Sequence, residues 1–382
     1  MDPPHKNLLG LNREELSTFA ESIGEKRYRG QQIFGWLYER GAREFPAMTN
    51  LGKAFLERLE RTAAIRGLTL RDRQTSRRDG TTKFLFELQD GLLIESVLIP
   101  PRSAFQPDGA GREDEYRRLS LCVSTQVGCP LDCKFCATGT MGFRRNLTAA
   151  EIVDQVLQVR NLTGRRVTNV VFMGMGEPML NYDQMMGSAD LMIEGAGIAA
   201  RHMTVSTAGW SEGIRRMADE GRKMKLAVSL HSAVESTRTA LMPVTKRFGL
   251  RDLLAALEYY CSRTEMRVTF EIIFFEGIND SEKELSALID FVRRVPSKVN
   301  VIPFHSIAFA GGGKAAVELR PAPALERLVA ALRSANLSAF VRTNAGDDIE
   351  AACGQLAVQH PRRGPGERSL PNPSILVPAR HA

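Results

Sequence analysis

Three cysteines in one short loop are the residues of this 382-residue chain with the most specific chemistry. Cys129, Cys133 and Cys136 have the spacing Cys-x3-Cys-x2-Cys. Three thiolates from one loop can bind three irons of a [4Fe-4S] cubane and leave the fourth iron without a protein ligand. A structural zinc ion normally takes four protein ligands, and this loop has no fourth Cys or His. The spacing therefore predicts a [4Fe-4S] cluster with one iron open to chemistry.

The remaining cysteines and the composition limit where the protein works. Cys122 lies close to the loop, whereas Cys261 and Cys353 are distant, unlike the cysteines of a small secreted disulfide scaffold. The N-terminus lacks the basic and apolar regions of a secretory signal, and no apolar run is long enough to cross a bilayer. We therefore expect a cytoplasmic protein with no membrane partner. The formal net charge of +7 permits an RNA partner but does not by itself indicate one.

A second group of polar residues follows predicted strands. Gly176 and Glu177 come after an apolar run, and Ser206, Ser229 and His305 each come at or just after another. Glycine lets the backbone approach a ligand closely, and a carboxylate can accept hydrogen bonds from an ammonium group. Taken singly, a Gly-rich turn with a surface Glu, or a Ser in a loop, is also common.

The elements that must position these groups alternate between strand and helix. Short β-type runs occupy residues 119–124, 167–173, 202–207, 224–230, 267–275, 298–304 and 337–343. Helices begin at Thr148, Tyr182 and near Trp210, and others span about 281–294 and 322–335. Repeated βα units imply a parallel sheet, and chemistry gathered at strand ends favours a barrel. The predicted fold class is α/β, with a partial (βα) TIM-type barrel as the core.

The N-terminal part is predicted to be a small, mainly helical accessory domain. Asn12 and Glu15 have the spacing of a capping box, and a second helix is expected over 31–38. Strands over 83–88 and 92–99 form a hairpin that closes this domain. The predicted boundaries are 1–100 for the accessory domain, 101–118 for a Pro- and Gly-rich linker, 119–360 for the core and 361–382 for a disordered tail.

The cysteine loop, with an aromatic residue before its last cysteine, resembles the radical S-adenosylmethionine (SAM) superfamily. In that superfamily the amino and carboxylate groups of SAM chelate the open iron. Further motifs from about Asn7 to Leu356 resemble the RlmN/Cfr family of radical SAM RNA methyltransferases. They are LCVSTQVGC, CKFCATGTMGFRRNL, MGMGEPMLN, VSTAG, LAVSLHS, LMPV and DDIEAACGQL.

The resemblance implies roles for named residues. Cys353 is the methyl carrier, which forms S-methylcysteine, and Cys122 forms a transient disulfide with it. Glu95 matches a proton acceptor of the family, although a strand Glu is more often a solvated residue. The SAM contacts implied by the family are Gly176, Glu177, Ser206, Ser229, Leu230, His231 and His305.

The implied activity is methylation of carbon 2 of adenine, in 23S rRNA at the peptidyl-transferase centre and in tRNA next to the anticodon. It consumes two SAM molecules per turnover and needs an electron donor such as flavodoxin with flavodoxin reductase. One alternative is the Cfr-like methylation of carbon 8 of adenine in 23S rRNA, although the extended N-terminal module favours the RlmN type. A second alternative is a non-catalytic iron-sulfur or zinc protein that binds RNA, but it leaves the distant Cys353 motif unexplained.

The chain differs from the family pattern at two places, and its N-terminal module has one basic group that is expected to contact RNA. After Arg342 the family continues with basic residues, whereas this chain has Thr343, Asn344 and Ala345. The family commonly has Asn where this chain has His305. The basic and aromatic residues expected to contact RNA in the N-terminal module are Lys26, Arg27, Tyr28, Arg29 and Trp36.

Overall fold

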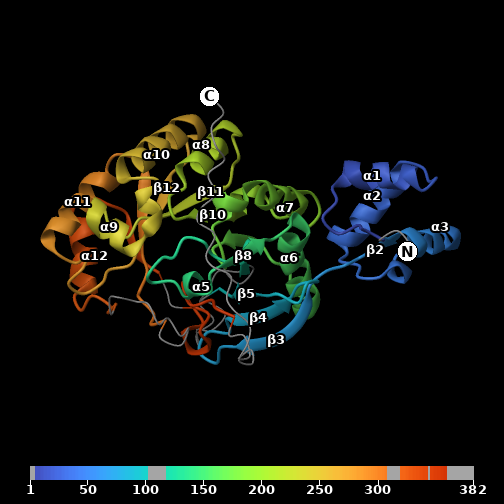
Figure 1. The fold of residues 1–382 in the computed structure, drawn as a ribbon, viewed down its shortest axis with the longest axis horizontal. Helices are drawn as coiled ribbons and strands as arrows, with labels where there is room; N and C mark the ends of the chain where they lie inside the picture. Colours follow the sequence, from blue (N-terminus) through green and yellow to red (C-terminus); the bar gives the residue numbers. More distant parts are fainter. Residues whose placement is uncertain (1–4, 102–117, 308–318, 343–344, 359–382) are drawn as a thin grey trace.

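The structure is a computed structural model that describes residues 5–101, 118–307, 319–342 and 345–358. Figure 1 shows a curved sheet with helices along its outer side and a smaller helical module beside α6 and α7. Most of the predicted linker, the departures Thr343 and Asn344, and the predicted tail lie outside the described residues.

Parallel strands form the core of the sheet. They pair in the order β6-β9-β10-β11-β12-β13-β14, so that each strand lies next to the one before it in this series. Their bounds are β6 (Ser120–Cys122), β9 (Asn169–Phe172), β10 (Met203–Thr207), β11 (Lys225–Ser229), β12 (Val268–Ile272), β13 (Ser297–Val301) and β14 (Ala339–Val341). The predicted strands of the core are all confirmed. Because the strands run parallel, their carboxyl ends share one edge of the sheet.

Helices connect the parallel strands, as the βα alternation predicts. They are α6 (Ala149–Thr163), α7 (Tyr182–Glu194), α8 (Ser211–Asp219), α9 (Glu235–Leu241), α10 (Leu250–Thr264), α11 (Glu282–Val292) and α12 (Leu325–Ser334). Thr148 caps α6 in a capping box with Glu151, which fixes the predicted start of this helix. Short helical turns precede or follow them: η4 (Pro178–Asn181), η5 (Ala200–His202) and η6 (Pro243–Lys246).

The predicted hairpin belongs to the same sheet as the core. β4 (Thr82–Glu87) and β5 (Leu93–Ile99) are antiparallel, and β5 pairs with β6 through Val97 and Cys122. A further strand, β3 (Thr69–Thr75), pairs with β4 and was not predicted. Nearly all its residues are exposed on both faces, so its sequence has no apolar alternation. In the described residues the sheet has ten strands and two free edges, β14 and β3, so the barrel is partial.

The N-terminal module is mainly helical, as predicted. It contains β1 (Lys6–Asn7), α1 (Arg13–Ser22), α2 (Tyr28–Phe34), the π-helical turn η1 (Gly35–Glu39), η2 (Phe45–Ala47), α3 (Lys53–Thr62) and β2 (Ala63–Ala64). The capping box of Asn12 and Glu15 is present at the start of α1. The module is joined to α6 by an ion pair between Arg43 and the fully buried Asp154, whose other oxygen accepts a bond from Leu68 N at 2.6 Å.

The C-terminal segment, residues 345–358, packs across the cysteine loop and the β3–β4 turn. It contains the short turn η8 (Asp347–Ile349). Its bonds to these two regions include Ala137 N to Gly354 O at 2.7 Å, Thr138 Oγ1 to Leu356 O at 2.6 Å and Gly346 N to Asp79 Oδ2 at 2.9 Å. This docking brings a segment more than 200 residues downstream against the cysteine loop.

No helix in the described part of the chain has the length and apolar character needed to cross a membrane.

Candidate active site

The cysteine loop follows β7 (Gln126–Gly128) and ends in the short helix α5 (Ala137–Thr140). β7 pairs with β8 (Phe143–Asn146), which closes the loop at its base. Gly128 has a φ of 73°, and a Cβ atom there would lie 1.7 Å from the carbonyl oxygen of Gly142. Glycine is therefore required immediately before Cys129, because any side chain would force the two arms of the loop apart.

The three loop thiols line one cavity together with the carboxyl ends of the parallel strands. We call this the cluster cavity; its lining includes Cys129, Cys133, Cys136, Gly176, Glu177, Ser206, Ser229, His231, Glu271, Arg342 and Cys353. Burial raises the pKa of Cys129 and Cys133 well above the ordinary value, and neighbouring loop thiols raise it further. A bound cation would reverse this preference, because metal ligation requires thiolates.

The donor set fits a cubane. Among the described residues, no three His, Cys, Asp or Glu side chains converge as the ligands of a single ion would. A cubane needs no such convergence, because each thiolate binds a different iron. Three partly accessible thiols on one cavity wall provide that arrangement.

Glu177 joins two of the loops around the cluster cavity. Its carboxylate accepts hydrogen bonds from Met179 N at 3.1 Å and from Ala208 N at 2.8 Å. Burial raises the pKa of this carboxyl to about 7. Glu177 is expected to bind the amino group of SAM. It also connects the loops after β9 and β10, so it shapes the cavity as well as lining it.

The other predicted SAM contacts divide between the cavity and the core. Gly176, Ser206 and Ser229 line the cluster cavity, as expected of contact residues. Gly176 has a φ of 101°, and a Cβ atom there would lie 2.5 Å from the Cβ of Gln126. Leu230 is fully buried and is not part of the lining. Its backbone N donates to Glu271 O at 3.1 Å, so it holds β11 against β12.

His231 presents one ring nitrogen without a partner. Its Nδ1 accepts a bond from Ile273 N at 3.0 Å, which leaves the proton on Nε2. Nε2 is buried and has no hydrogen-bond partner among the described residues. The ring packs 4.3 Å from Phe135 of the cysteine loop, and burial lowers the pKa of the imidazole to about 3. His231 is therefore a neutral side chain with a free donor beside the cluster cavity.

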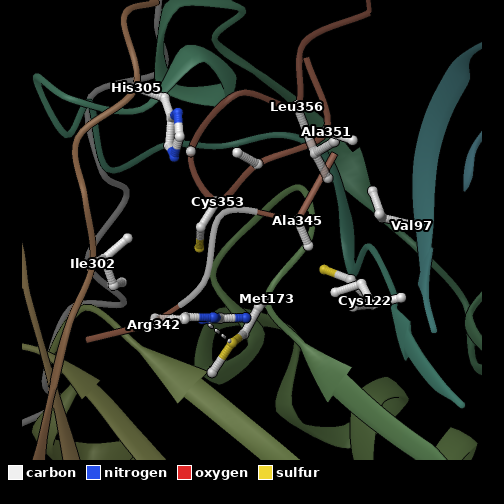
Figure 2. Close-up of a pocket in the computed structure, with 13 residues that line it drawn as sticks. Val97, Cys122, Met173, Ile302, His305, Arg342, Ala345, Ala351, Cys353 and Leu356 are labelled. Atoms are coloured by element: carbon white, nitrogen blue, oxygen red, sulfur yellow. Dashed lines mark hydrogen bonds between the residues drawn. The ribbon is translucent and has the colours of Figure 1, made fainter. Parts of the chain in front are cut away.

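Cys122 and Cys353 line a second cavity, shown in Figure 2. We call it the cysteine cavity; its lining is Val97, Ile99, Cys122, Met173, Ile302, His305, Arg342, Ala345, Ala351, Ala352, Cys353, Gly354 and Leu356. Cys122 comes from the end of β6, and Cys353 comes from the C-terminal segment. Cys353 also lines the cluster cavity, so it lies where the two cavities meet.

Arg342 is the cation at this junction. Its guanidinium lies below the Cys353 sulfur in the view of Figure 2 and donates to Met173 Sδ at 3.6 Å. Burial raises the pKa of Cys122 to about 12. Burial also raises the pKa of Cys353, and Arg342 opposes this rise. Cys353 is surrounded by these groups yet remains accessible to water, because its sulfur faces the cavity.

Glu271 is a second charged residue at this site, and it was not predicted from the sequence. It is 3% exposed on β12, and its Oε1 accepts a bond from Asn300 Nδ2 at 3.1 Å. Its Oε2 has no hydrogen-bond partner among the described residues. Burial raises the pKa of Glu271, and Arg342 opposes this. A lone acidic residue inside the apolar run 267–275 was the signal that could have found it.

His305 lies in the cysteine cavity, where Asp347 holds it. The His305 Nδ1 atom is 2.6 Å from Asp347 Oδ1. His305 thus lines the same cavity as Cys122 and Cys353 and does not line the cluster cavity.

Glu95 is buried in the hairpin and is not the solvated residue that its strand position suggested. It is 5% exposed and pairs with Lys83 Nζ at 3.4 Å. Burial raises its pKa, and Lys83 opposes this rise. Glu95 shares a face of β5 with Val97, but it is not part of the cysteine cavity lining.

The predicted basic group of the N-terminal module is partly neutralised. Arg27 is paired with Glu14 and Glu21, and Arg29 lies 4.0 Å from Glu25. Tyr28 remains 47% exposed. An aromatic surface is thus available for a base, whereas two of the three predicted cations already have acidic partners.

Comparison with known families assigns both parts of the chain. Residues 6–65 match the ribosomal RNA large subunit methyltransferase N-terminal domain, and residues 123–289 match the radical SAM superfamily. The first match ends before β3, so it covers the helical module without the hairpin. The second covers the cysteine loop and most of the parallel strands.

Individual relatives match over nearly the whole chain. The probable dual-specificity RNA methyltransferase RlmN of Heliobacterium modesticaldum is 43% identical, over 92% of this chain and 89% of the relative. The protein of the same description from Thermotoga maritima is 40% identical, over 93% of this chain and 98% of the relative. The crystal structure of a radical SAM methyltransferase from Sphaerobacter thermophilus has a TM-score of 0.82 at 38% identity, over 92% of this chain and 99% of that one.

Proposed function

This chain belongs to the RlmN family of radical SAM RNA methyltransferases, and on that premise we propose that it methylates carbon 2 of adenine through an S-methylcysteine on Cys353. The proposed substrates are 23S rRNA, at the peptidyl-transferase centre, and tRNA, next to the anticodon. The enzyme uses a [4Fe-4S] cluster and SAM, as its superfamily does. Each turnover is proposed to consume two SAM molecules.

One observation carries this proposal: Cys353 lines both cavities. On one side it faces the cavity of Cys129, Cys133 and Cys136, and on the other it shares a wall with Cys122. A residue that carries a carbon from SAM to RNA must reach both reactants without leaving its segment. Its place at the junction of the cavities supports that role.

Cys129, Cys133 and Cys136 would hold the cluster, which with bound SAM supplies a 5′-deoxyadenosyl radical. The chain's own part is to orient the reactants. Glu177 and the Nε2 donor of His231 both line the cluster cavity and are proposed to hydrogen-bond SAM there.

Cys353 performs the first bond-making step. Its sulfur attacks the methyl group of SAM, the S–CH3 bond forms, the sulfonium bond of SAM breaks, and the thiol proton leaves. Arg342 supports this step, because a guanidinium beside the sulfur stabilises the thiolate. Carbon 2 of adenine is not nucleophilic, so SAM cannot methylate it directly. Removal of a hydrogen atom from the S-methyl group makes the methyl carbon reactive enough to bond to carbon 2 of the ring.

Cys122 completes the reaction in this proposal. After the new carbon is joined to both Cys353 and adenine, the proton on carbon 2 must leave and the link to Cys353 must break. The Cys122 sulfur assists the proton removal, and the adduct must also give up its unpaired electron, for which the oxidised cluster would be the acceptor. The Cys122 thiolate then attacks the Cys353 sulfur: the disulfide forms, the S–CH2 bond breaks, and the CH2 carbon takes up a proton from water to become the methyl group of the released base. An external electron donor, such as flavodoxin with its reductase, restores the two thiols and supplies the electron for radical formation.

The RNA must deliver one adenine to a cavity between the sheet and the C-terminal segment. A base inside a helix cannot reach such a site, so the target adenine must be unpaired or extruded. The N-terminal module, with the exposed Tyr28 ring, is proposed to hold the surrounding RNA.

Two cysteine variants test the proposal in cells that lack the native enzyme. Cys353→Ala should retain the cluster and yield no methylated adenosine. Cys122→Ala should accept a methyl group on Cys353, start the reaction and stall with RNA attached through a methylene bridge. A nuclease-sensitive band on a denaturing gel detects that adduct.

The matched control is Cys261→Ala, because Cys261 lies in α10 and lines neither cavity. It should methylate RNA normally. Chromatography with mass spectrometry of the nucleosides shows which carbon of adenine is methylated, because 2-methyladenosine and 8-methyladenosine elute separately. Finding the 8-methyl product, or normal turnover by either cysteine variant, would overturn the assignment.

A further inference from the structure

His305 and Asp347 form a dyad that opens into the cysteine cavity. His305 is almost buried, with 8% of its side chain exposed, whereas Asp347 is 42% exposed. Their Nδ1 and Oδ1 atoms are 2.6 Å apart. The two residues are more than 40 positions apart in the sequence, and the tertiary structure brings them into contact. Figure 2 shows the His305 imidazole inside the cavity that Cys353 and Cys122 also line.

Asp347 sets the chemistry of the ring. A carboxylate accepts a hydrogen bond, so Nδ1 carries the proton and Nε2 is the nitrogen with a lone pair. A carboxylate that holds one ring nitrogen protonated makes the other a stronger proton acceptor, as in catalytic triads. The carboxylate of Asp347 is the charged group in contact with this ring. The charged and titratable groups that line the cavity with the ring are Arg342, Cys122 and Cys353.

Asn, which the resemblance to the family implies at this position, has no comparable capacity. An amide donates and accepts hydrogen bonds but does not take up a proton near neutral pH. The replacement of Asn by His therefore adds proton-transfer chemistry to a position where a polar contact is the family pattern.

We propose that His305, oriented by Asp347, is a further catalytic residue that accepts the thiol proton of Cys353 when that cysteine is methylated. This inference rests on the proposed function, which makes Cys353 the methyl acceptor. The step balances: the Cys353 S–H bond breaks, its electron pair forms the S–CH3 bond, SAM becomes S-adenosylhomocysteine, and the proton moves to His305 Nε2. No oxidant or reductant is needed.

The dyad also provides an exit for the proton. Asp347 lies between the cavity and the surface, and its second oxygen is 3.9 Å from Arg78 Nη1. The Arg78 side chain is 73% exposed. A proton on the imidazolium can therefore pass to water at the rim without crossing the cluster cavity. Glu95 does not compete for this role, because it pairs with Lys83 outside the cavity lining.

The test isolates the first methyl transfer. The cluster-loaded enzyme, freed of its methyl group, is mixed anaerobically with methyl-labelled SAM, without RNA and without reductant. Mass spectrometry of the Cys353 peptide then follows the gain of one methyl group over time at several pH values. Cluster absorbance confirms that each variant is folded and loaded.

His305→Asn should methylate Cys353 about 100-fold more slowly than the native enzyme near neutral pH, the usual contribution of a general base. Its rate should rise steeply with pH as hydroxide replaces the missing base, whereas the native rate levels off. The Asp347→Asn variant should methylate Cys353 at a rate between those of the native enzyme and the His305→Asn variant. A residue that only made a polar contact would be replaced by Asn without a change in the pH profile.

His202→Asn is the matched control, because His202 lies in η5, at the amino-terminal end of β10 and away from both cavities. It should keep the native profile. A His305→Asn enzyme with the native rate and pH profile would overturn the inference while leaving the proposed function intact. Failure of the native enzyme to methylate Cys353 at all would instead overturn the proposed function.

Discussion

Glu177 allows a prediction that links the shape of the cluster cavity to a measurable free energy. The change is Glu177→Gln, which keeps the size of the side chain and removes its titration. The native carboxyl is 3% exposed and accepts bonds from the backbone N–H groups of Met179 and Ala208. A Gln side chain has one acceptor oxygen, so one of these N–H groups loses its partner.

The sign of the pH effect follows from the raised pKa. Burial raises the pKa of Glu177 from 4.5 to about 7. Between these values the folded chain holds a proton that the unfolded chain has lost, so the free energy of unfolding falls as the pH rises. The expected fall is about 3 kcal/mol across this window. The Gln variant lacks this fall but loses about 1–3 kcal/mol at every pH through the unpaired N–H group.

The variant should therefore be less stable than the native chain near pH 5 and equally or more stable near pH 8. Urea unfolding of the cluster-free protein, followed by circular dichroism at several pH values, measures the difference. Glu57→Gln is the control, because Glu57 is 58% exposed on α3 and its replacement should change the free energy of unfolding by less than about 0.5 kcal/mol. A constant difference for Glu177→Gln would refute the reasoning, since it would mean that the buried carboxyl titrates as in the unfolded chain.

Three further changes test other parts of the structure. Cys133→Ala should remove the visible iron-sulfur absorbance and SAM cleavage together, and stoichiometric zinc without iron in the native protein would contradict the cluster assignment. Gly354→Ala should slow methylation of the neighbouring cysteine while the cluster is retained, because this glycine has a φ of 87° and a Cβ atom would lie 3.2 Å from Phe135 O. The left-handed strain is about 1–2 kcal/mol, and an unchanged methylation rate would show that the segment tolerates it. Asp154→Asn should lower the free energy of unfolding by about 2 kcal/mol, less than for a fully buried pair because Arg43 is 29% exposed. Chemical denaturation measures this loss, and no change would mean that the pair does not hold the N-terminal module to α6.

Local patterns in the sequence were sufficient to predict the strands and helices of the core. The βα alternation predicted the parallel strands, and the Thr148 and Asn12 caps predicted where two helices begin. These features depend on residues close together in the chain, so the sequence contains the whole signal. β3 escaped prediction because an edge strand with both faces exposed has no apolar periodicity.

The cluster loop was likewise a local signal. Cys129, Cys133 and Cys136 are close in sequence, and their spacing alone predicts a [4Fe-4S] site. By contrast, the pairing of Cys122 with Cys353 came from resemblance to a family and not from spacing.

Only the tertiary structure decided which distant residues share a cavity. The docking of residues 345–358 on the cysteine loop puts Cys353 between the two cavities and brings Arg342 beneath its sulfur. The same docking places Asp347 beside His305, a pairing that the sequence did not predict, and the SAM contact of His305 stays a prediction. Burial and ion pairing of this kind depend on which segments pack together. The sequence by itself therefore determined the reactive groups and the elements that carry them, and the packing of the chain decided what each group faces.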